Sequence, residues 1–416
     1  MIIDFTPPWN RSFDVYSIRK DFPILHRRVN GNTLIWLDNS ATTQKPLEVM
    51  QSLDQYYRQY NSNIHRGAHT LANEATDAYE AARDKIRDFI KAAFSEEVIF
   101  TRGTTEAINL IAESLGPMIL QEGDEILLTE MEHHANIVPW QKLQQDRGAI
   151  IKVIPINDQG EVLLEEYEKL LSTRTKIVGI TQVSNVLGTV NPIETMVRMA
   201  NAQGAFTVID GAQAVPHLPI DVKQLDADFY VFSGHKMYGP TGIGILYGKR
   251  EILEQMPPWQ RGGGMISNVT FNHTTFNHLP YKFEAGTGNI ADAIGLGVAV
   301  DYLNRLGMEK VEEHERQLTL YALERLSQIP HVQLIGTAPD KISVLSFIID
   351  GISPESVGAY LNQEGIAVRA GHHCAQPVLR RFGLNSAVRA SLGIYNTSDE
   401  IDSLTNAVLK IAKLYN

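Results

Sequence analysis

The chain has 416 residues, of which 44% are hydrophobic and 20% are charged, a composition typical of a globular protein of two or three domains. Its formal net charge is -11 and no run of lysine or arginine stands out, which argues against nucleic acid as a main partner. No apolar run reaches the roughly 18 residues that a membrane span needs, so we expect no span and no membrane partner.

The first ten residues carry Asp4 and two prolines, and they lack the basic and apolar stretches of a signal peptide. We assign them no role. Beyond them, short apolar runs alternate with segments of helical pattern, such as residues 106–114 and 192–203. The runs that predict buried strands are residues 33–37, 98–101, 125–129, 177–181, 207–209 and 229–232. This alternation predicts an α/β fold whose mostly parallel sheet is covered by helices on both faces.

The last part of the chain has a different pattern. Residues 344–349 predict a strand and residues 355–364 a helix. Thr397 followed by Glu400 forms the capping box of a last helix.

We therefore expect two domains. A large domain would cover residues 31–300, and a smaller α/β domain would combine residues 1–30 with residues 301–416. The helical segment near residues 301–328 would connect them, and the smaller domain would carry the loop that contains Cys374.

Two predicted strands are each followed by a residue whose side chain could take part in catalysis. Asp210 follows the strand at residues 207–209, and Lys236 follows the strand at residues 229–232. In open parallel sheets, ligands bind beyond the carboxyl ends of the strands. A lysine that forms a Schiff base and an acid that pairs with a protonated ring nitrogen are what pyridoxal phosphate needs. A lone lysine is more often a solvated surface residue, but the glycines around Lys236 indicate close approach of the backbone to a ligand.

A phosphate site is indicated at a third strand end. Gly103, Thr104 and Thr105 stand at the start of a predicted helix, where free N–H groups and the helix dipole attract phosphate. A threonine in such a place is more often only a helix cap. Ser233 and His235 are also suitably placed for phosphate contacts.

Cys374 is the only cysteine, so no disulfide can form within the chain, which fits a reducing compartment such as the cytoplasm. A lone cysteine is usually a small buried hydrophobic residue. Here Gly371, His372 and His373 precede it and polar residues surround it, which predicts an exposed loop. Arg369 and the two histidines would favour the thiolate, which is the nucleophilic form.

Several motifs resemble, in their order along the chain, those of the NifS-like cysteine desulfurases of the class V aminotransferase family. They are residues 102–106 (Arg-Gly-Thr-Thr-Glu), 132–136 (Glu-His-His-Ala-Asn), 210–213 (Asp-Gly-Ala-Gln) and 233–236 (Ser-Gly-His-Lys). Residues 369–375 (Arg-Ala-Gly-His-His-Cys-Ala) resemble the group II branch, the SUF type, which includes selenocysteine lyase-like members. The resemblance extends from about residue 15 to the end.

The resemblance implies a fold-type I pyridoxal phosphate-dependent transferase that works as a homodimer, with the cofactor in the large domain. Lys236 would hold the cofactor, Asp210 would pair with its ring nitrogen, and Gln213 would bond its ring hydroxyl. His133 would stack on the ring and relay protons. The implied phosphate ligands are Thr104, Thr105, Ser233 and His235, together with Thr287 from the other subunit.

Further residues are implied for the substrate. Asn185 and Arg389 would bind the amino acid, with Arg389 on its carboxylate, and Arg369 would also contact it. His65 and Arg66 would line the entrance. The resemblance implies no metal.

The implied reaction converts L-cysteine to L-alanine and leaves the sulfur on Cys374 as a persulfide. Because the chain has no second cysteine, the sulfur must pass to an external acceptor, by analogy a small carrier of the SufE type, for iron–sulfur cluster assembly or other sulfur metabolism. The resemblance also implies activity on selenocysteine.

Three alternatives remain open at this point. Another aminotransferase or lyase of the same fold would use the cofactor without Cys374, since fold does not fix function. A non-catalytic scaffold that binds the cofactor would not need Lys236. A metal hydrolase based on His133, His134 and Cys374 is disfavoured because the spacing of structural zinc ligands is missing.

Overall fold

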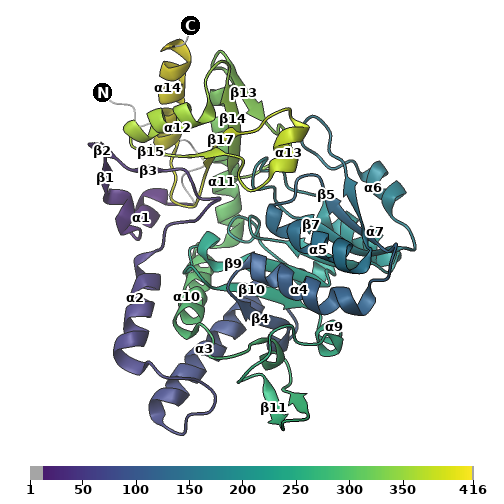
Figure 1. The fold of residues 1–416 in the computed structure, drawn as a ribbon. Helices are drawn as coiled ribbons and strands as arrows, with labels where there is room; N and C mark the ends of the chain where they lie inside the picture. Colours follow the sequence, from purple (N-terminus) through teal and green to yellow (C-terminus); the bar gives the residue numbers. More distant parts are fainter. Residues whose placement is uncertain (1–12, 415–416) are drawn as a thin grey trace.

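The computed structural model describes residues 13–414. The first ten residues, for which no role was predicted, lie outside the described part. Within that part, seven strands form a main sheet at the centre of the molecule (Figure 1). Their order across the sheet is β4 (Val98–Thr101), β10 (Gly244–Gly248), β9 (Phe229–Ser233), β8 (Phe206–Asp210), β7 (Thr175–Thr181), β5 (Glu125–Thr129) and β6 (Ile150–Ile154).

The main sheet is parallel except for one strand. β6, β5, β7, β8 and β9 pair in parallel, while β10 is antiparallel to both of its neighbours, β9 and β4. β4 therefore runs in the same direction as β9, and six of these strands end at one edge. Residues that follow the six strands are thus brought to a common edge, where ligands of such sheets bind.

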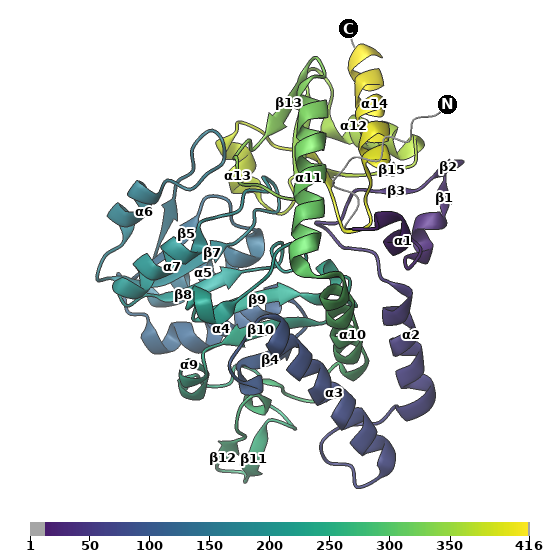
Figure 2. The same cartoon turned by 180° about the vertical axis from the view of Figure 1, so that it is seen from behind.

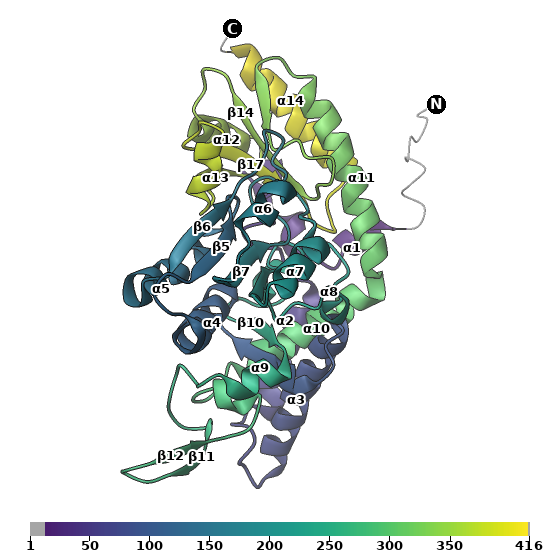
Figure 3. The same ribbon diagram turned by 90° about the vertical axis from the view of Figure 1, so that its right-hand side faces the viewer.

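Helices cover both faces of this sheet because successive side chains of a strand point to opposite sides. Ile126 and Leu128 of β5 pack in one cluster with Trp140 of α5 (Val138–Arg147), whereas Leu127 packs in another cluster with Met196 of α7 (Ile193–Ala202). Figure 3 shows α4 and α5 on one side and α7 on the other. The helices around the sheet are α3 (Thr70–Phe89), α4 (Thr104–Ile119), α5 (Val138–Arg147), α6 (Leu164–Leu170), α7 (Ile193–Ala202), α8 (Val222–Leu225), α9 (Arg250–Gln255) and α10 (Ile290–Leu306).

The strand predicted at residues 33–37 is wrong as a single buried strand. The chain instead forms two short strands, β2 (Asn32–Thr33), paired with β1 (Arg28–Val29), and β3 (Ile35–Trp36), paired with β15 (Ile366–Ala367). Neither belongs to the main sheet. Ile35 and Trp36 are only partly buried, because this segment runs along the edge of the smaller region of the molecule.

A second sheet follows later in the chain and is antiparallel throughout. Its order is β13 (Val332–Ile335), β14 (Val344–Ile349), β17 (Ala387–Ser391) and β16 (Arg369–Gly371). One hydrophobic cluster joins it to α11 (Met308–Ser327), α12 (Pro354–Gln363) and α14 (Ser398–Leu414). The strand predicted at residues 344–349 is confirmed, and the predicted helix begins one residue earlier than expected.

The predicted capping box is confirmed at the start of α14. The Glu400 N–H donates to Thr397 Oγ1 over 3.3 Å, and the Thr397 N–H donates to Glu400 Oε2 over 3.2 Å. Glu400 also pairs with Arg19 of α1 (Val15–Arg19) over 2.9 Å. The start of the described chain is thereby tied to the last helix, but the domain limits near residues 30 and 300 stay a prediction.

The remaining elements lie around these two sheets. α11 runs beside both regions, which is clear from behind in Figure 2. A hairpin extends away from the main sheet in the same view and carries Phe271, which is fully exposed. These elements are α2 (Leu47–Gln55), the hairpin strands β11 (Ile266–Val269) and β12 (Thr274–Phe276), and α13 (Gln376–Arg381). Among residues 13–414, no helix combines the length and the apolarity that crossing a membrane requires.

The buried side chain of His314 on α11 makes stability depend on pH. Its ring stacks on Phe13, with centroids 4.5 Å apart, and its Nε2 lies 3.2 Å from the carbonyl oxygen of Asn396. Burial lowers the pKa of His314 from the usual 6.5 to about 4. Between these two values the unfolded chain binds a proton at this residue that the folded chain excludes, so stability falls as pH falls.

We expect His314→Gln to weaken this dependence, because glutamine can donate to the same carbonyl and does not titrate. Between pH 6.5 and about 4, the free energy of unfolding of the wild type should fall with decreasing pH more steeply than that of His314→Gln. The difference in slope should be about 1.4 kcal/mol per pH unit. Urea unfolding at several pH values would measure both slopes. Equal slopes for the two proteins would contradict the assignment.

Candidate active site

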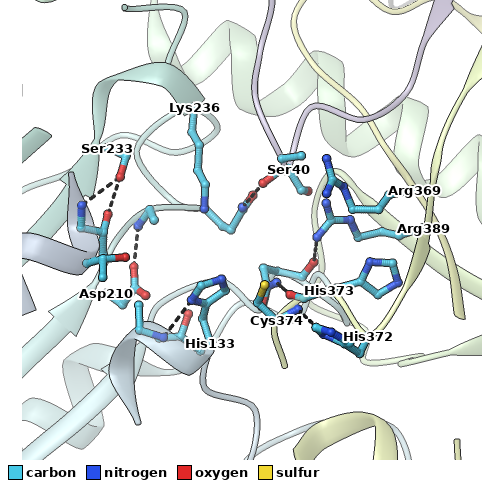
Figure 4. A pocket seen from close by; sticks show the side chains of 18 of the residues that line it. Ser40, His133, Asp210, Ser233, Lys236, Arg369, His372, His373, Cys374 and Arg389 are labelled. Atoms are coloured by element: carbon cyan, nitrogen blue, oxygen red, sulfur yellow. Dashed lines mark hydrogen bonds between the residues drawn. The ribbon is translucent and has the colours of Figure 1, made fainter. Parts of the chain in front are cut away.

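A pocket of about 480 Å³ lies at the carboxyl edge of the main sheet, against the second sheet (Figure 4). It brings together most of the residues that the sequence singled out. In Figure 4, Asp210 and Ser233 lie on one side of Lys236, and Cys374 and Arg389 lie on the other. Its lining includes Thr104, Thr105, His133, Asn185, Asp210, Gln213, Ser233, His235, Lys236, Arg369, Cys374 and Arg389.

Asp210 and Lys236 reach the pocket because their strands, β8 and β9, are parallel neighbours. Desolvation is the largest influence on the amine and lowers the pKa of Lys236; Asp210 opposes this shift and Arg389 adds to it. Desolvation likewise raises the pKa of the Asp210 carboxyl, against the effect of Lys236. A lysine held in this way is more readily deprotonated, which is the form that attacks an aldehyde.

Gln213 leaves a buried acceptor without a partner. Its Nε2 donates to the carbonyl oxygen of Ser40 over 2.7 Å, which fixes the orientation of the amide. Its Oε1 is buried and has no hydrogen-bond partner. Buried polar atoms are normally paired, so this oxygen fits a ligand that brings a hydroxyl group next to Asp210.

His133 lines the same pocket in its neutral form. Burial, followed by the charge of Lys236, lowers the pKa of His133 to about 3. Its Nδ1 accepts a hydrogen bond from the Ala135 N–H over 3.0 Å, so the proton of the neutral ring lies on Nε2. A neutral, oriented ring at this position suits stacking on an aromatic cofactor.

The loop that carries His133 is held by Glu132, a residue of the 132–136 motif for which no role was predicted. The carboxylate is fully buried and accepts from the Thr181 N–H and from Asn136 Nδ2, each over 2.8 Å. Burial raises the pKa of Glu132 to about 8. The bond to Thr181 ties the end of β5 to the end of β7, and so holds His133 at the edge of the sheet.

The N-terminus of α4 provides a seat for an anion. The Thr104 N–H donates to Ser233 Oγ over 2.9 Å, and the two hydroxyls lie 2.8 Å apart. Gly103 has a φ of +154°, and a Cβ there would lie 3.2 Å from Ser233 Oγ. Thr105 and His235 complete this end of the pocket, at the position where the sequence predicts a phosphate site.

Two arginines from the second sheet close the opposite end. Arg369 of β16 forms a bidentate pair with Asp38, with bonds of 3.1 and 2.9 Å. Arg389 of β17 is buried, donates from Nη1 to the carbonyl oxygen of Asn185 over 2.9 Å, and lies 3.4 Å from Asp38 through Nη2. Its Nε–H is buried without a partner. One donor edge of Arg389 is therefore available to a carboxylate.

Arg389 stays protonated although it is buried. Burial lowers the pKa of Arg389 to about 10, while Asp38 acts in the opposite direction, so the side chain is a cation at neutral pH. Sequence reasoning missed Asp38 and Ser40. Both follow the strand predicted at residues 33–37, and the strand-end rule that selected Asp210 could have selected Asp38 as well.

Three predicted residues lie elsewhere within a single chain. His65, Arg66 and Thr287 line a second pocket of about 450 Å³, together with Tyr281 and Glu284. They do not line the pocket of Lys236 within the single chain, so the entrance role of His65 and Arg66 stays a prediction.

The residues of the first pocket fit pyridoxal phosphate. An amine, a buried carboxylate and an unpartnered amide oxygen surround the position of a ring, and a helix N-terminus with two hydroxyls suits its phosphate. Within residues 13–414, no group of three or more histidine, cysteine or acidic side chains is arranged to hold a metal ion.

Comparison with known proteins identifies the family. The aminotransferase class-V family matches residues 35–404. The chain belongs to this family. Because the family works with pyridoxal phosphate, the cofactor predicted from the sequence is confirmed, and so is the α/β fold class.

Two relatives of this chain are described as a cysteine desulfurase and a probable cysteine desulfurase. A cysteine desulfurase of Synechococcus elongatus is 57% identical over 96% of this chain, and the chain spans 64% of that protein's length. A probable cysteine desulfurase of Halalkalibacterium halodurans is 49% identical over 97% of the chain and 99% of its own length.

The fold of the class-V chain also matches solved structures. The crystal structure of the cysteine desulfurase CsdA of Escherichia coli, in its S-sulfonic acid form, superposes with a TM-score of 0.90 at 38% identity. That comparison covers 97% of this chain and 99% of the other. The resemblance to cysteine desulfurases is therefore confirmed, while the group II assignment stays a prediction.

Proposed function

We propose that this protein is a cysteine desulfurase that converts L-cysteine to L-alanine and retains the sulfur as a persulfide on Cys374. The observation that carries the proposal is that the exposed Cys374 and the amine of Lys236 line the same pocket. An aminotransferase or lyase of this fold has no need of a thiol at that place, whereas sulfur transfer requires one.

The chain's own residues divide the work at the cofactor end. Bound pyridoxal phosphate supplies an electron sink for the substrate carbon. Lys236 holds the cofactor and then removes the substrate Cα proton through Nζ, as its lowered pKa allows. Asp210 would hold the proton of the ring nitrogen, Gln213 would accept from the ring hydroxyl through its unpartnered Oε1, and His133 would stack on the ring.

The sulfur step takes place at Cys374. Its thiolate attacks the sulfur of the bound cysteine, a sulfur–sulfur bond forms, and the carbon–sulfur bond breaks. The electron pair of the broken bond goes to the substrate carbon, which gains a proton and leaves as the methyl group of alanine. Atoms and electrons balance without an added oxidant, because the persulfide retains the sulfane sulfur.

Arg389 orients the substrate through its carboxylate. The unpartnered Nε–H and the neighbouring Nη2–H form a donor edge for bidentate binding. Asn185 supports this geometry through its carbonyl oxygen, and Asp38 holds Arg369 beside it. With two arginines and one aspartate, this end of the pocket has one positive charge to match one carboxylate.

We expect Arg389→Lys to raise KM for cysteine roughly 10- to 100-fold, because a hydrogen bond to a charged group contributes about 1.5–3 kcal/mol. Lysine keeps the charge but cannot bind the carboxylate through a planar pair of donors. Alanine formation at varied cysteine concentration measures the effect. Cysteine ethyl ester, which lacks the carboxylate, is the control and should distinguish the two proteins little; an equal loss with the ester would contradict this role.

The remaining proposals concern partners and setting. We propose a homodimer, in which Thr287 of one chain reaches the cofactor phosphate of the other and His65 and Arg66 line the partner's entrance. Their place in a separate pocket within one chain supports this arrangement. Light scattering should give about twice the 46.4 kDa mass of the chain.

The persulfide needs an external acceptor because the chain has one cysteine. We propose a SufE-type carrier that serves iron–sulfur cluster assembly in the cytoplasm, and a group II, SUF-type protein that also accepts selenocysteine. A large domain over residues 31–300 and a small domain over residues 1–30 and 301–416 complete this proposal.

The deciding experiment incubates the purified protein with cysteine and measures alanine and sulfide, with and without reductant. Without reductant, we expect alanine limited to a single turnover and one added sulfur on the peptide that contains Cys374, because the only thiol is then blocked. With reductant, we expect sulfide release and continued alanine formation. Pyruvate or keto-acid products without the added sulfur would favour a different pyridoxal phosphate enzyme. No product together with retained cofactor would favour a scaffold.

A further inference from the structure

The loop that carries Cys374, residues 371–376, has a backbone that needs external support. His373 and Cys374 both have left-handed φ values, +52° and +55°. Residues with a side chain adopt this region rarely, and two in succession persist only where surrounding contacts hold them.

His134 forms two hydrogen bonds to the loop, one at Cys374 and one at Gln376, two residues further on. Its backbone N–H donates to the Cys374 carbonyl oxygen over 2.7 Å. Its ring Nε2 accepts from the Gln376 N–H over 3.1 Å. These bonds join the end of β5, in the main sheet, to a loop of the second sheet, across 242 residues of sequence in the case of Gln376.

Other contacts hold the rest of the loop. Asn185 Nδ2 donates to the His373 carbonyl oxygen over 2.8 Å, and the Cys374 N–H donates to Nδ1 of His372 over 3.1 Å. The latter bond is drawn in Figure 4. The rings of His134 and His372 lie 5.8 Å apart. His134 is the residue whose side chain reaches the loop just beyond the thiol.

We propose that His134 is a positioning residue, whose ring nitrogen holds the Cys374 loop so that the thiol faces the bound substrate. The catalytic consequence of this inference rests on the proposed function. The hydrogen bond from the Gln376 N–H to the His134 ring, here called the clamp, does not depend on that function. Nε2 is free to accept because burial and the neighbouring His372 lower the pKa of His134 and keep the ring neutral.

The test compares His134→Ala with His134→Gln. Alanine removes the acceptor, whereas the Oε1 of glutamine can accept the same N–H. His26→Ala, at an exposed histidine distant in sequence from the loop, is the matched control. All variants are prepared with cofactor, and an unchanged visible absorbance confirms that the remainder of the site is intact.

The first readout does not depend on activity. Hydrogen–deuterium exchange of the peptide that contains residues 371–379 should be about fivefold faster or more in His134→Ala, the factor expected for loss of one hydrogen bond. His134→Gln should restore protection. Unchanged exchange in His134→Ala would overturn the clamp.

The second readout tests the consequence for catalysis. His134→Ala should lower kcat for alanine formation about tenfold with little change in KM, since substrate binding at Arg389 is untouched, and His134→Gln should recover most of it. Faster exchange with unchanged kcat would overturn the positioning role. A wild-type protein that forms no alanine would refute the proposed function instead, and the exchange result would still decide the clamp.

Discussion

Lys236→Ala should abolish the visible absorbance of the bound cofactor and lower alanine formation from cysteine by at least about a thousandfold. The same amine is expected to hold the cofactor and to take the Cα proton, so one substitution removes both roles. The pocket offers Lys236 a buried carboxylate partner in Asp210, and desolvation lowers the pKa of its amine. A spectrum of the purified variant and an alanine assay measure the two losses.

Lys169→Ala is a suitable control for that experiment, because Lys169 is exposed and forms only a surface ion pair with Glu166. It should keep both the absorbance and the activity. If Lys236→Ala retained the visible band, the cofactor would be bound through a different lysine, and the assignment of this pocket would be wrong.

Cys374→Ser should retain the cofactor absorbance but lower alanine formation from cysteine by at least about a hundredfold, since a serine hydroxyl cannot serve as the sulfur nucleophile. No added sulfur should be found on the peptide by mass spectrometry. Because the chain has no other cysteine, no second thiol can substitute for it. The separation of absorbance from activity distinguishes this variant from Lys236→Ala.

Selenocysteine provides the contrast for Cys374→Ser. The carbon–selenium bond is weaker than the carbon–sulfur bond, so we expect the variant to lose much less activity on selenocysteine. Unaltered alanine release from cysteine would contradict the role of Cys374 and would favour another lyase of the same fold.

Much of the main sheet could be predicted from local patterns. Residues 98–101 and 125–129 form strands with the predicted limits, because buried parallel strands are continuous apolar runs. β10 was missed since glycines occupy both of its ends, and its antiparallel direction depends on pairing with β9 and β4. No local signal reports such pairing.

The site could be predicted only as far as residue chemistry allows. Lys236, Asp210 and Cys374 stand out by their neighbours in sequence, and the structure places them around one pocket. Asp38 also follows a predicted strand, but its role could not be predicted, because that role lies in its bonds to Arg369 and Arg389, far along the chain. The hydrogen bond between His134 and the loop that carries Cys374 could not be predicted for the same reason.

The long sequence separation of those bonds has a consequence for how the protein is made. Asp38 and Arg389 are bonded across 351 residues of sequence, and Arg389 lies on β17. A ribosome must therefore release the large sheet and most of the second sheet before the arginine end of the pocket can form. Lys236 and the edge of the main sheet are thus synthesised well before the two arginines, so the pocket is completed only after Arg389 has left the ribosome.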